Sequence, residues 1–341
     1  MDGIDWKNLG FSYLKTDYNI RCHFRDGQWG ELEVSSSEHV DVHIAATALH
    51  YGQSAFEGLK AFRGRDGLVR IFRCEENAKR MALSCQGILM AEFPVKRFRE
   101  AVRRVLQLNA RFIPPYESGA SLYIRPLLFG TGANIGVKAA TEYLFLVLVT
   151  PVGPYFKEGF KPVDLVIFRQ YDRAAPLGTG NIKIAGNYAA SLVAGHRAHQ
   201  EGYAAVLYLD PKEKKYLDEG GPANFFGIKN NSYVTPCSQT ILPSITNNSL
   251  MKLAEDAGMR VERRQIPVEE LGTFEEVGIC GTAAVISPVK RIYDHDLQKE
   301  YRFCPDGEAG PLSRNLYHRL RAIQYGDEAD PLGWVEVLEG I

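Results

Sequence analysis

Lys183 stands between two isoleucines in the segment NIKIAGNY (residues 181–188), an unusual setting for a charged side chain. In an extended segment alternate side chains point to opposite sides, so the amine either reaches solvent or faces a second, chemical environment. Apolar neighbours penalise the ammonium form and lower the pKa of a lysine, which frees its lone pair for attack on a carbonyl carbon, as Schiff-base chemistry requires. A solvated, inert lysine is the alternative, and the order of residues does not decide between the two.

Two acidic residues precede a glycine pair in LDEGGPANFF (residues 217–226). If Asp218 or Glu219 points inward, its carboxylate needs a cationic partner and could hold a proton on a ring nitrogen. If both lie on the rim of a turn, they are ordinary solvated acids, which is the commoner arrangement. The sequence leaves both interpretations open.

Two further segments could present backbone N–H groups to a ligand. In ILPSITNNSLMKLAEDAG (residues 241–258), Thr246 and Asn247 can cap a helix, whose first turn offers unpaired N–H groups to an anion. In CGTAAVISP (residues 280–288), small residues predict a loop whose backbone a ligand could approach closely. A capped helix without a ligand and a plain tight turn explain these two segments equally well.

Two glycine-rich segments do not fit nucleotide-binding motifs. GTGANIG (residues 130–136) has its third glycine one position late for a dinucleotide fingerprint, and no clear helix follows it. GTGNIK (residues 178–183) lacks the Gly-Lys-Ser/Thr ending of a phosphate-binding loop. A Rossmann oxidoreductase or a nucleotide triphosphatase therefore has weak support.

The composition is that of a globular protein with room for two domains. The chain has 341 residues, of which 45% are hydrophobic, and a formal net charge of -1, so no overall field would draw it onto nucleic acid or an anionic membrane. A small molecule is the expected partner.

A cytoplasmic location is expected from two features of the sequence. The start MDGIDWKNLG lacks the pattern of a signal peptide, and the apolar run at residues 143–149 is far shorter than the roughly 20 residues that span a bilayer. The 6 cysteines contain no C-x-x-C pair and indicate neither a zinc site nor a redox pair.

The spacing of apolar residues predicts the elements of the first half of the chain. Residues 95–112 are expected to form an amphipathic helix with arginines on its outer face. Residues 120–129 and 142–151 read as strands, the second of them buried on both faces. Glycine and proline concentrate in residues 152–162, where we expect a domain boundary.

Beyond that boundary a strand at residues 163–168 and a helix from about residue 187 to 199 are expected. Hairpins follow, one of them turning at Asn230-Asn231, a pair that suits a type I′ turn. A later helix is expected to end at Gly258. The inner face predicted for the helix at 187–199 consists of Ala189, Leu192, Val193 and His196.

Six segments in order resemble the branched-chain amino acid aminotransferases, pyridoxal-phosphate enzymes of fold type IV. They are HYGQSAFEGLKAFR (50–63), YIRPLLFGTGANIGV (123–137), NIKIAGNYAAS (181–191), LDEGGPANFF, LPSIT and GTAAVISPV. The resemblance implies an α+β fold with a small α/β N-terminal domain (1–151), an interdomain linker (152–162) and a larger C-terminal domain (163–341) with a pseudo-barrel of mostly antiparallel strands. It also implies reversible transamination of L-leucine, L-isoleucine and L-valine with 2-oxoglutarate, with pyridoxal 5'-phosphate as cofactor.

The same resemblance assigns the cofactor contacts. Lys183 would carry pyridoxal 5'-phosphate and move the substrate's proton, Tyr188 would hydrogen-bond the cofactor's phenolic oxygen, and Glu219 would pair with its ring nitrogen, which preserves the ring as an electron sink. The expected phosphate ligands are Arg80, Thr282 and the backbone N–H groups of Ile245 and Thr246.

The substrate contacts implied by the resemblance come from three parts of the chain. The α-carboxylate would bind Tyr123 and the backbone of Thr282 and Ala283, and the aliphatic side chain would lie against Phe56 and Tyr188. Glutamate would be admitted by Tyr51 and Arg125, and Ile135 and Val137 would enter the site of a neighbouring subunit, so that the active unit is at least a homodimer. The residues concerned are Tyr51, Phe56, Tyr123, Arg125, Ile135, Val137, Tyr188, Thr282 and Ala283.

The chain departs from some relatives at two places. Ala284 and Ser287 stand where mammalian members have a C-x-x-C pair, so no thiol switch is expected there, and Lys60 stands where several members have arginine. Within the same fold the alternatives are a D-amino acid aminotransferase and an aminodeoxychorismate lyase, which are generally shorter and are not expected to carry residues 50–62 together with YIRPL. A binding protein without enzymatic activity on the same scaffold is the alternative from another class.

Overall fold

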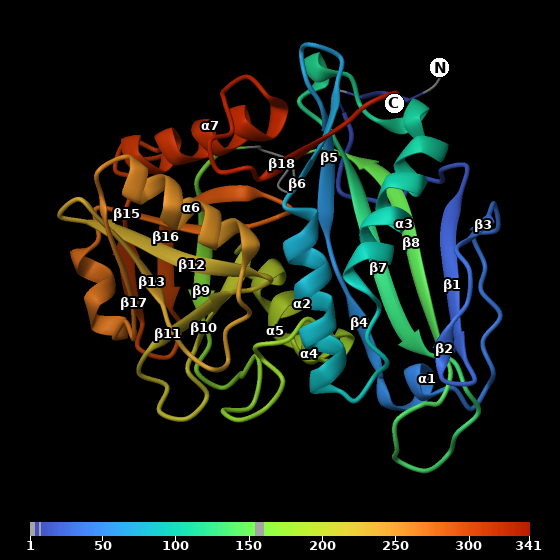
Figure 1. The fold of residues 1–341 in the computed structure, drawn as a ribbon. Helices are drawn as coiled ribbons and strands as arrows, with labels where there is room; N and C mark the ends of the chain where they lie inside the picture. Colours follow the sequence, from blue (N-terminus) through green and yellow to red (C-terminus); the bar gives the residue numbers. More distant parts are fainter. Residues whose placement is uncertain (1–3, 7, 154–159) are drawn as a thin grey trace. The chain divides into compact units, whose positions relative to one another are not determined.

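The computed structural model describes residues 4–6, 8–153 and 160–341 (Figure 1). The chain forms two compact units. Unit 1 contains Met1–Lys157, Ile182–Gly186 and Ala322–Ile341, and unit 2 contains Glu158–Asn181 and Asn187–Arg321, so the lysine segment belongs to unit 1. The predicted division into residues 1–151, a linker and residues 163–341 stays a prediction, because residues 154–159 of that linker lie outside the described residues.

Unit 1 is built on an antiparallel sheet of nine strands in the order β18-β6-β5-β7-β8-β1-β2, with β3 beside β1 and β4 beside β7. The strand β18 comes from the end of the chain and pairs with β6. The strands are β1 (Asn19–Arg25), β2 (Gln28–Trp29), β3 (Glu33–Ser35), β4 (Ser54–Phe56), β5 (Leu59–Arg63), β6 (Val69–Phe72), β7 (Ser121–Gly130), β8 (Tyr143–Val152) and β18 (Val335–Leu338).

Helix α3 packs on this sheet through one apolar stripe. In α3 the residues Phe98, Val102 and Val105 recur at helical spacing and are fully buried against the sheet, as the sequence predicted. The strand β8 is a continuous apolar run and is buried on both faces, again as predicted. The helical elements before β8 are α1 (Thr47–Tyr51), α2 (Cys74–Gly87), α3 (Val95–Leu108) and the short 3-10 turns η1 (Ala110–Phe112) and η2 (Tyr116–Ser118).

Unit 2 contains a second nine-stranded sheet, which closes on itself. The order β11-β10-β9-β16-β15-β12 returns to its start because β11 also pairs with β12. Pairing is parallel where β9 meets β10 and β16 and where β13 meets β14, and antiparallel elsewhere. The strands are β9 (Val163–Ile167), β10 (Ala205–Leu209), β11 (Leu217–Gly220), β12 (Ala223–Lys229), β13 (Ser232–Pro236), β14 (Arg260–Arg264), β15 (Glu276–Gly281), β16 (Val285–Asp294) and β17 (Lys299–Arg302). The helical elements from residue 185 onward are α4 (Ala185–Ala190), α5 (Leu192–Gln200), α6 (Ile245–Asp256), η3 (Val268–Thr273) and α7 (Pro311–Tyr325).

The helix predicted over residues 187–199 is two short helices, and its predicted inner face was wrong. Leu192 and Val193 are 70% and 65% exposed, whereas Ala194 and Ala198 are buried against β10 and the neighbouring aromatic rings. Small side chains allow the helix to lie close to the strand, so the alanine stripe at i and i+4 faces inward and the larger apolar residues face outward. Periodicity alone could not choose between the two stripes.

The backbone conformation of the turn between β12 and β13 is the one that the sequence predicts. Asn230 and Asn231 have φ of 48° and 54°, the left-handed values that a type I′ turn requires, and Lys229 pairs with Ser232. Gly258 follows α6 with φ of 78°, also as predicted.

The N-cap of α6 differs from the prediction. Ser244 caps the helix by accepting a hydrogen bond from the backbone N–H of Asn247 at 3.1 Å, while Thr246 and Asn247 lie inside the first turn. The run CGTAAVISP is also more ordered than expected, because Gly281 pairs with Val285 and only residues 282–284 form the turn between β15 and β16.

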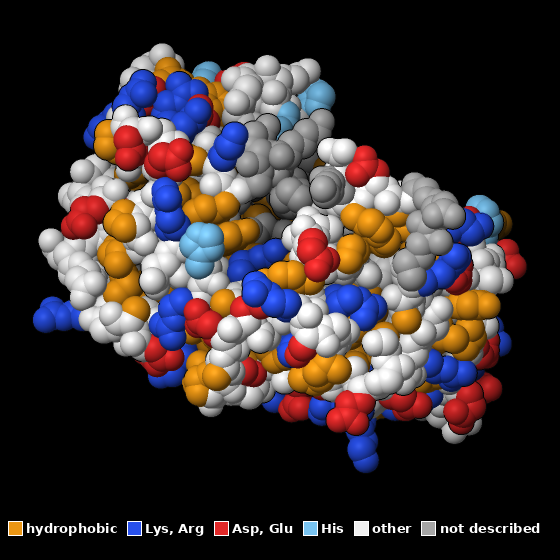
Figure 2. All heavy atoms as spheres, turned by 90° about the horizontal axis from the view of Figure 1, so that it is seen from above, with side chains coloured by type: hydrophobic (Ala, Val, Ile, Leu, Met, Phe, Trp, Pro, Cys, Tyr) orange, Lys and Arg blue, Asp and Glu red, His pale blue; other side chains and the backbone are white. Residues whose placement is uncertain are grey.

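Basic and acidic side chains are interspersed over the face in view in Figure 2, in keeping with the formal net charge of -1. Across residues 4–6, 8–153 and 160–341, no helix is both long enough and apolar enough to cross a membrane.

Candidate active site

The segment that carries Lys183 is fixed to unit 1 on both sides. The backbone N–H of Lys183 donates to Oγ of Ser84 at 2.8 Å, and its carbonyl accepts from the N–H of Phe56 at 3.1 Å. Ile184 forms a bridge with Ala55 and is buried in the core of unit 1, and Ile182 packs against that core. The two isoleucines therefore anchor the segment, while the lysine amine lies 4.7 Å from the ring centre of Phe56.

The surroundings of Lys183 make it a weak base for a lysine. Burial of the amine is the largest cause, the charge of Arg80 acts in the same direction, and the charge of Glu57 opposes them, so that the pKa of Lys183 falls from 10.5 to about 8. Although the residue as a whole is only partly buried, its amine is poorly hydrated. The lowered pKa raises the fraction of unprotonated amine near neutral pH, and nucleophilic attack on an aldehyde needs that form.

Arg80 is held by a carboxylate that sequence analysis did not single out. Glu57 is fully buried and accepts from Nε of Arg80 at 2.8 Å and from Nη2 at 2.7 Å, and Asn77 donates to the same carboxylate at 2.8 Å. Such a two-point contact fixes the plane of the guanidinium. A glutamate inside a largely apolar segment is the same kind of signal as the lysine between isoleucines, so Glu57 could have been found from SAFEGLKAF, where it lies between β4 and β5.

Aromatic and cationic side chains gather on β4, β5 and β7 of unit 1. Nη2 of Arg125 donates to the hydroxyl of Tyr123 at 3.0 Å, and its guanidinium lies 4.9 Å from the ring centre of Phe56. Lys60 pairs with Tyr123 across β5 and β7 and is buried. Gly58 leaves room for this cluster, because a side chain there would collide with the Tyr123 hydroxyl.

Tyr51, Ile135 and Val137 lie on the surface of unit 1. The hydroxyl of Tyr51 donates to the carbonyl of Ile135, and the three side chains are 43%, 71% and 88% exposed.

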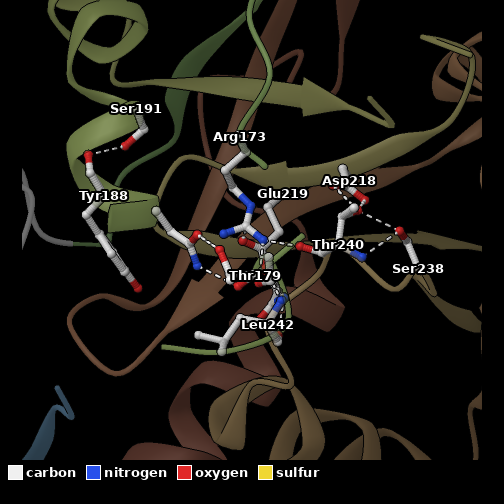
Figure 3. A network of polar contacts seen from close by, with 12 residues as sticks. Arg173, Thr179, Tyr188, Ser191, Asp218, Glu219, Ser238, Thr240 and Leu242 are labelled. Atoms are coloured by element: carbon white, nitrogen blue, oxygen red, sulfur yellow. Dashed lines mark hydrogen bonds and ion pairs between the residues drawn. The ribbon is translucent and has the colours of Figure 1, made fainter. Parts of the chain in front are cut away.

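In unit 2 the two acidic residues of β11 are both buried, which decides the alternative left open by the sequence. Oε1 of Glu219 accepts from Nδ2 of Asn224 at 3.1 Å and from the N–H of Leu242 at 2.7 Å. Asp218 accepts from the Thr240 hydroxyl at 2.9 and 2.7 Å, and burial raises its pKa (Figure 3). Neither acid is a solvated rim residue.

Strand register places Glu219 in a row of residues that leads toward the turn after β15. Glu219 pairs with Asn224, and Asn224 pairs with Cys280, so the three residues form a row across β11, β12 and β15. Thr282 and Ala283 follow that row in the turn after β15. The N–H of Leu242 ties Glu219 to the loop that leads into α6, whose first turn contains Ile245 and Thr246.

Tyr188 belongs to α4, where its carbonyl accepts from the hydroxyl of Ser191 at 2.8 Å. The preceding residue Asn187 donates to the carbonyl of Thr179 at 2.7 Å and accepts from its hydroxyl at 2.7 Å. These paired contacts hold the start of the unit 2 part of α4.

Comparison with known proteins shows the family of this chain. A model of the family described as amino-transferase class IV matches residues 54–292. The branched-chain-amino-acid aminotransferase of Haemophilus influenzae is 45% identical over 99% of this chain and 100% of its own, and that of Helicobacter pylori is 45% identical over 98% of each. This chain belongs to that family.

Solved structures of the family have the same fold. The branched-chain amino acid aminotransferase of Escherichia coli is 28% identical, with a TM-score of 0.78 over 94% of this chain and 99% of that one. The holo-form of the enzyme of Thermobaculum terrenum, solved in its PLP form, is 26% identical, with a TM-score of 0.76 over 95% of this chain and 98% of that one. The predicted family, the fold type IV architecture, the transaminase class and the family's dependence on pyridoxal phosphate are thereby confirmed.

The residues of this aminotransferase chain fit the chemistry of pyridoxal phosphate. An aldehyde needs an amine that is partly unprotonated, and Lys183 supplies one. In unit 1 the guanidinium of Arg80 is suited to a phosphate, and in unit 2 the first turn of the 12-residue helix α6 by itself offers N–H groups to an anion. A protonated ring nitrogen suits a buried carboxylate that neighbouring donors hold in place, as they hold Glu219.

Arg173 is a second residue that sequence analysis missed. It lies 2.9 Å from Glu219 yet comes from residues between β9 and the lysine segment, a stretch without a periodic pattern or motif. Only the folded chain shows that this arginine belongs with the acid.

Proposed function

We propose that this protein transfers the amino group of L-leucine, L-isoleucine or L-valine to 2-oxoglutarate, giving branched-chain 2-oxo acids and L-glutamate. Membership of the family supports the reaction class, and the branched-chain substrates are those named for relatives that match over almost their whole length. The reaction is reversible and consists of two half-reactions, so ping-pong kinetics are expected.

Lys183 is the catalytic residue of this proposal. Pyridoxal 5'-phosphate, when bound, supplies an electron sink for the negative charge that develops at the substrate's Cα. Lys183 would hold the cofactor and, when free of it, would take the proton from Cα, a role that a pKa of about 8 suits because the amine can accept and return a proton near neutral pH. This poorly hydrated amine is the observation that carries the proposal.

The cofactor contacts follow from the chemistry of each group. Arg80, oriented by Glu57, would bind the phosphate together with the backbone N–H groups of Ile245 and Thr246 and with Thr282. Tyr188 would donate to or accept from the phenolic oxygen. Glu219 would hold the proton on the ring nitrogen, since its position is fixed by Asn224 and Leu242.

Substrate recognition is divided among aromatic, cationic and backbone groups. Tyr123 and the backbone of Ala283 would bind the α-carboxylate, and Phe56 and Tyr188 would contact the aliphatic side chain. Arg125 is suited to the second carboxylate of glutamate because it carries a fixed charge beside Tyr123. Tyr51 would lie at the entrance to that position.

A homodimer or larger homo-oligomer is part of the proposal. Ile135 and Val137 are 71% and 88% exposed, and burial against a second copy of the chain would remove this apolar area from water. We also propose a cytoplasmic location, where the six unbonded cysteines would remain reduced.

The attachment of the cofactor to Lys183 can be tested directly. The purified protein is incubated with pyridoxal 5'-phosphate and reduced with borohydride, and the modified peptide is mapped. The label is expected on Lys183, and Lys183→Ala is expected to bind the cofactor only non-covalently and to lose almost all turnover. A label on another lysine, or substantial turnover by Lys183→Ala, would refute the assignment.

Rates of turnover of L-leucine, D-alanine and aminodeoxychorismate separate the proposed reaction from the other activities of this fold. No turnover of any of the three would favour a binding protein without enzymatic activity.

A further inference from the structure

Arg173 and Glu219 form an ion pair inside unit 2. Nε of Arg173 lies 2.9 Å from Oε2 of Glu219, and the two side chains are 8% and 5% exposed. The same guanidinium donates through Nη2 to the carbonyl of Gly180 at 2.7 Å and to the carbonyl of Thr240 (Figure 3). Contacts with three separate segments of the chain therefore hold the guanidinium of Arg173 against the carboxylate of Glu219.

The convergence of these segments requires glycine at position 180. A side chain on Gly180 would collide with the carbonyl oxygen of Thr240. Because the two backbones approach so closely, one guanidinium nitrogen reaches both carbonyls. Thr240 also donates through its hydroxyl to Asp218, so the loop that holds Arg173 is itself tied to β11.

The partners of Glu219 divide between neutral and charged groups. Asn224 and the backbone of Leu242, which contact Oε1, are neutral dipoles, whereas Arg173, which contacts Oε2, carries a full positive charge. A carboxylate in a poorly solvated place takes up a proton unless a charge compensates for the lost water. The arginine supplies this compensation whether or not a ligand is present.

We propose that Arg173 is a positioning residue that keeps Glu219 ionised, so that the proton shared between Glu219 and a bound pyridine ring stays on the ring nitrogen. This inference rests on the proposed function. Arg173 contacts the carboxylate of Glu219 directly. A proton on this carboxylate would therefore lie nearer to the guanidinium charge than a proton on the ring nitrogen of the bound pyridine. Repulsion between like charges therefore favours the proton on the ring.

The test uses a probe that does not depend on Lys183. The probe 4'-deoxypyridoxine 5'-phosphate has the ring nitrogen and the phosphate but no aldehyde, and its ring nitrogen can be labelled with ¹⁵N. The ¹⁵N resonance of the bound probe reports whether that nitrogen is protonated, independently of turnover. The full-length protein is compared with the single variants Arg173→Gln, Arg173→Lys, Glu219→Gln and Arg169→Gln and with the double variant that combines Arg173→Gln with Glu219→Gln.

The control is Arg169→Gln, which removes the partly exposed arginine that pairs with another buried carboxylate of unit 2. Arg169 contacts the fully buried Asp294 at 2.7 Å, and we assign neither residue to the cofactor. Its complex is expected to keep the protonated ring of the unmodified protein, which would show that removing an arginine from a buried carboxylate elsewhere in unit 2 is not enough to change the probe.

Arg173→Gln is expected to move the ¹⁵N resonance toward that of the neutral ring, in the direction of Glu219→Gln, and to weaken probe binding about tenfold or more. In the Glu219→Gln background the same substitution is expected to change affinity less than about twofold, because Arg173 acts through Glu219. Arg173→Lys keeps the charge and is expected to retain the protonated ring.

A ring that stays protonated in Arg173→Gln while Glu219→Gln makes it neutral overturns the inference and leaves the proposed function intact. If the unmodified protein does not bind the probe, or if Glu219→Gln leaves the resonance unchanged, the proposed cofactor site fails instead, and the inference with it. If Arg173→Gln does not fold, Arg173→Lys decides, since a neutral ring in that variant contradicts a role carried by the charge.

Discussion

Replacing Lys183 by methionine should stabilise the protein in the absence of cofactor. Burial lowers the pKa of Lys183 from 10.5 to about 8, and because each unit of pKa is worth about 1.36 kcal/mol, the charged amine destabilises the folded state by about 3 kcal/mol at pH 7. The contact of the amine with the Phe56 ring, 4.7 Å away, offsets roughly 1 kcal/mol of that cost. We therefore expect Lys183→Met to raise the free energy of unfolding by about 2 kcal/mol at pH 7.

The dependence on pH separates this effect from a general gain in packing. Below about pH 8 the lysine is protonated in both the folded and the unfolded state, so the full cost is present. Between about pH 8 and 10.5 the unfolded state binds more protons than the folded state, so the unmodified protein gains stability relative to the variant as the pH rises. Because the contact with the Phe56 ring also favours the charged amine, the difference between the two proteins at pH 9.5 should be about 1 kcal/mol smaller than at pH 7.

Urea unfolding of both proteins at pH 7 and pH 9.5 measures the difference. The control is Lys79→Met, since Lys79 is an exposed partner of Glu75 and Glu76 on α2 and its substitution should give the same difference at both pH values. A variant Lys183→Met that is less stable than the unmodified protein at pH 7, or a difference that does not change with pH, would refute the reasoning from desolvation.

Three further expectations can be checked by the same unfolding measurement. Glu57→Gln leaves the buried guanidinium of Arg80 without its carboxylate and should cost about 3–5 kcal/mol, whereas Glu76→Gln in an exposed pair should cost less than about 1 kcal/mol; equal costs would contradict the buried pair. Ser244→Ala removes the side-chain acceptor at the start of α6 and should cost about 0.5–2 kcal/mol, and an unchanged stability would show that the cap contributes nothing. Asn230→Val places a β-branched residue at a φ of 48° and should cost about 1–2 kcal/mol, while Asn230→Gly should be nearly neutral; a tolerated valine would exclude the type I′ turn.

Secondary structure was predictable from the sequence where the side chains of a segment restrict its backbone conformation or its burial. The helix predicted over residues 95–112, the doubly buried strand at Tyr143–Val152 and the turn at Asn230-Asn231 follow from side-chain spacing and left-handed turn preference. All three are confirmed, although the helix ends at Leu108 and a short 3-10 turn covers Ala110–Phe112. The inner face of α5 was wrong because two stripes of apolar residues compete on one short helix, and the packing of β10 selects the smaller one.

The chemistry of the site was predictable only in part. Lys183 stood out because isoleucines on both sides contradict its charge, and the same argument would have found Glu57. Arg173 carried no such signal. Its importance comes from a contact with Glu219, 46 residues away in the chain, and no pattern of local spacing encodes a pairing between a loop and a strand.

The sequence by itself determined which kinds of side chain are available and the family to which the chain belongs, because these depend on residue identity and order. It also determined that Lys183 sits between two anchors that prefer the core. Only the tertiary structure decided that both Asp218 and Glu219 are buried, that Glu57 orients Arg80 and that Arg173 faces Glu219. The physical reason is that burial and electrostatic pairing depend on distance in space, and strand register and loop closure bring those groups together only when the whole chain has folded.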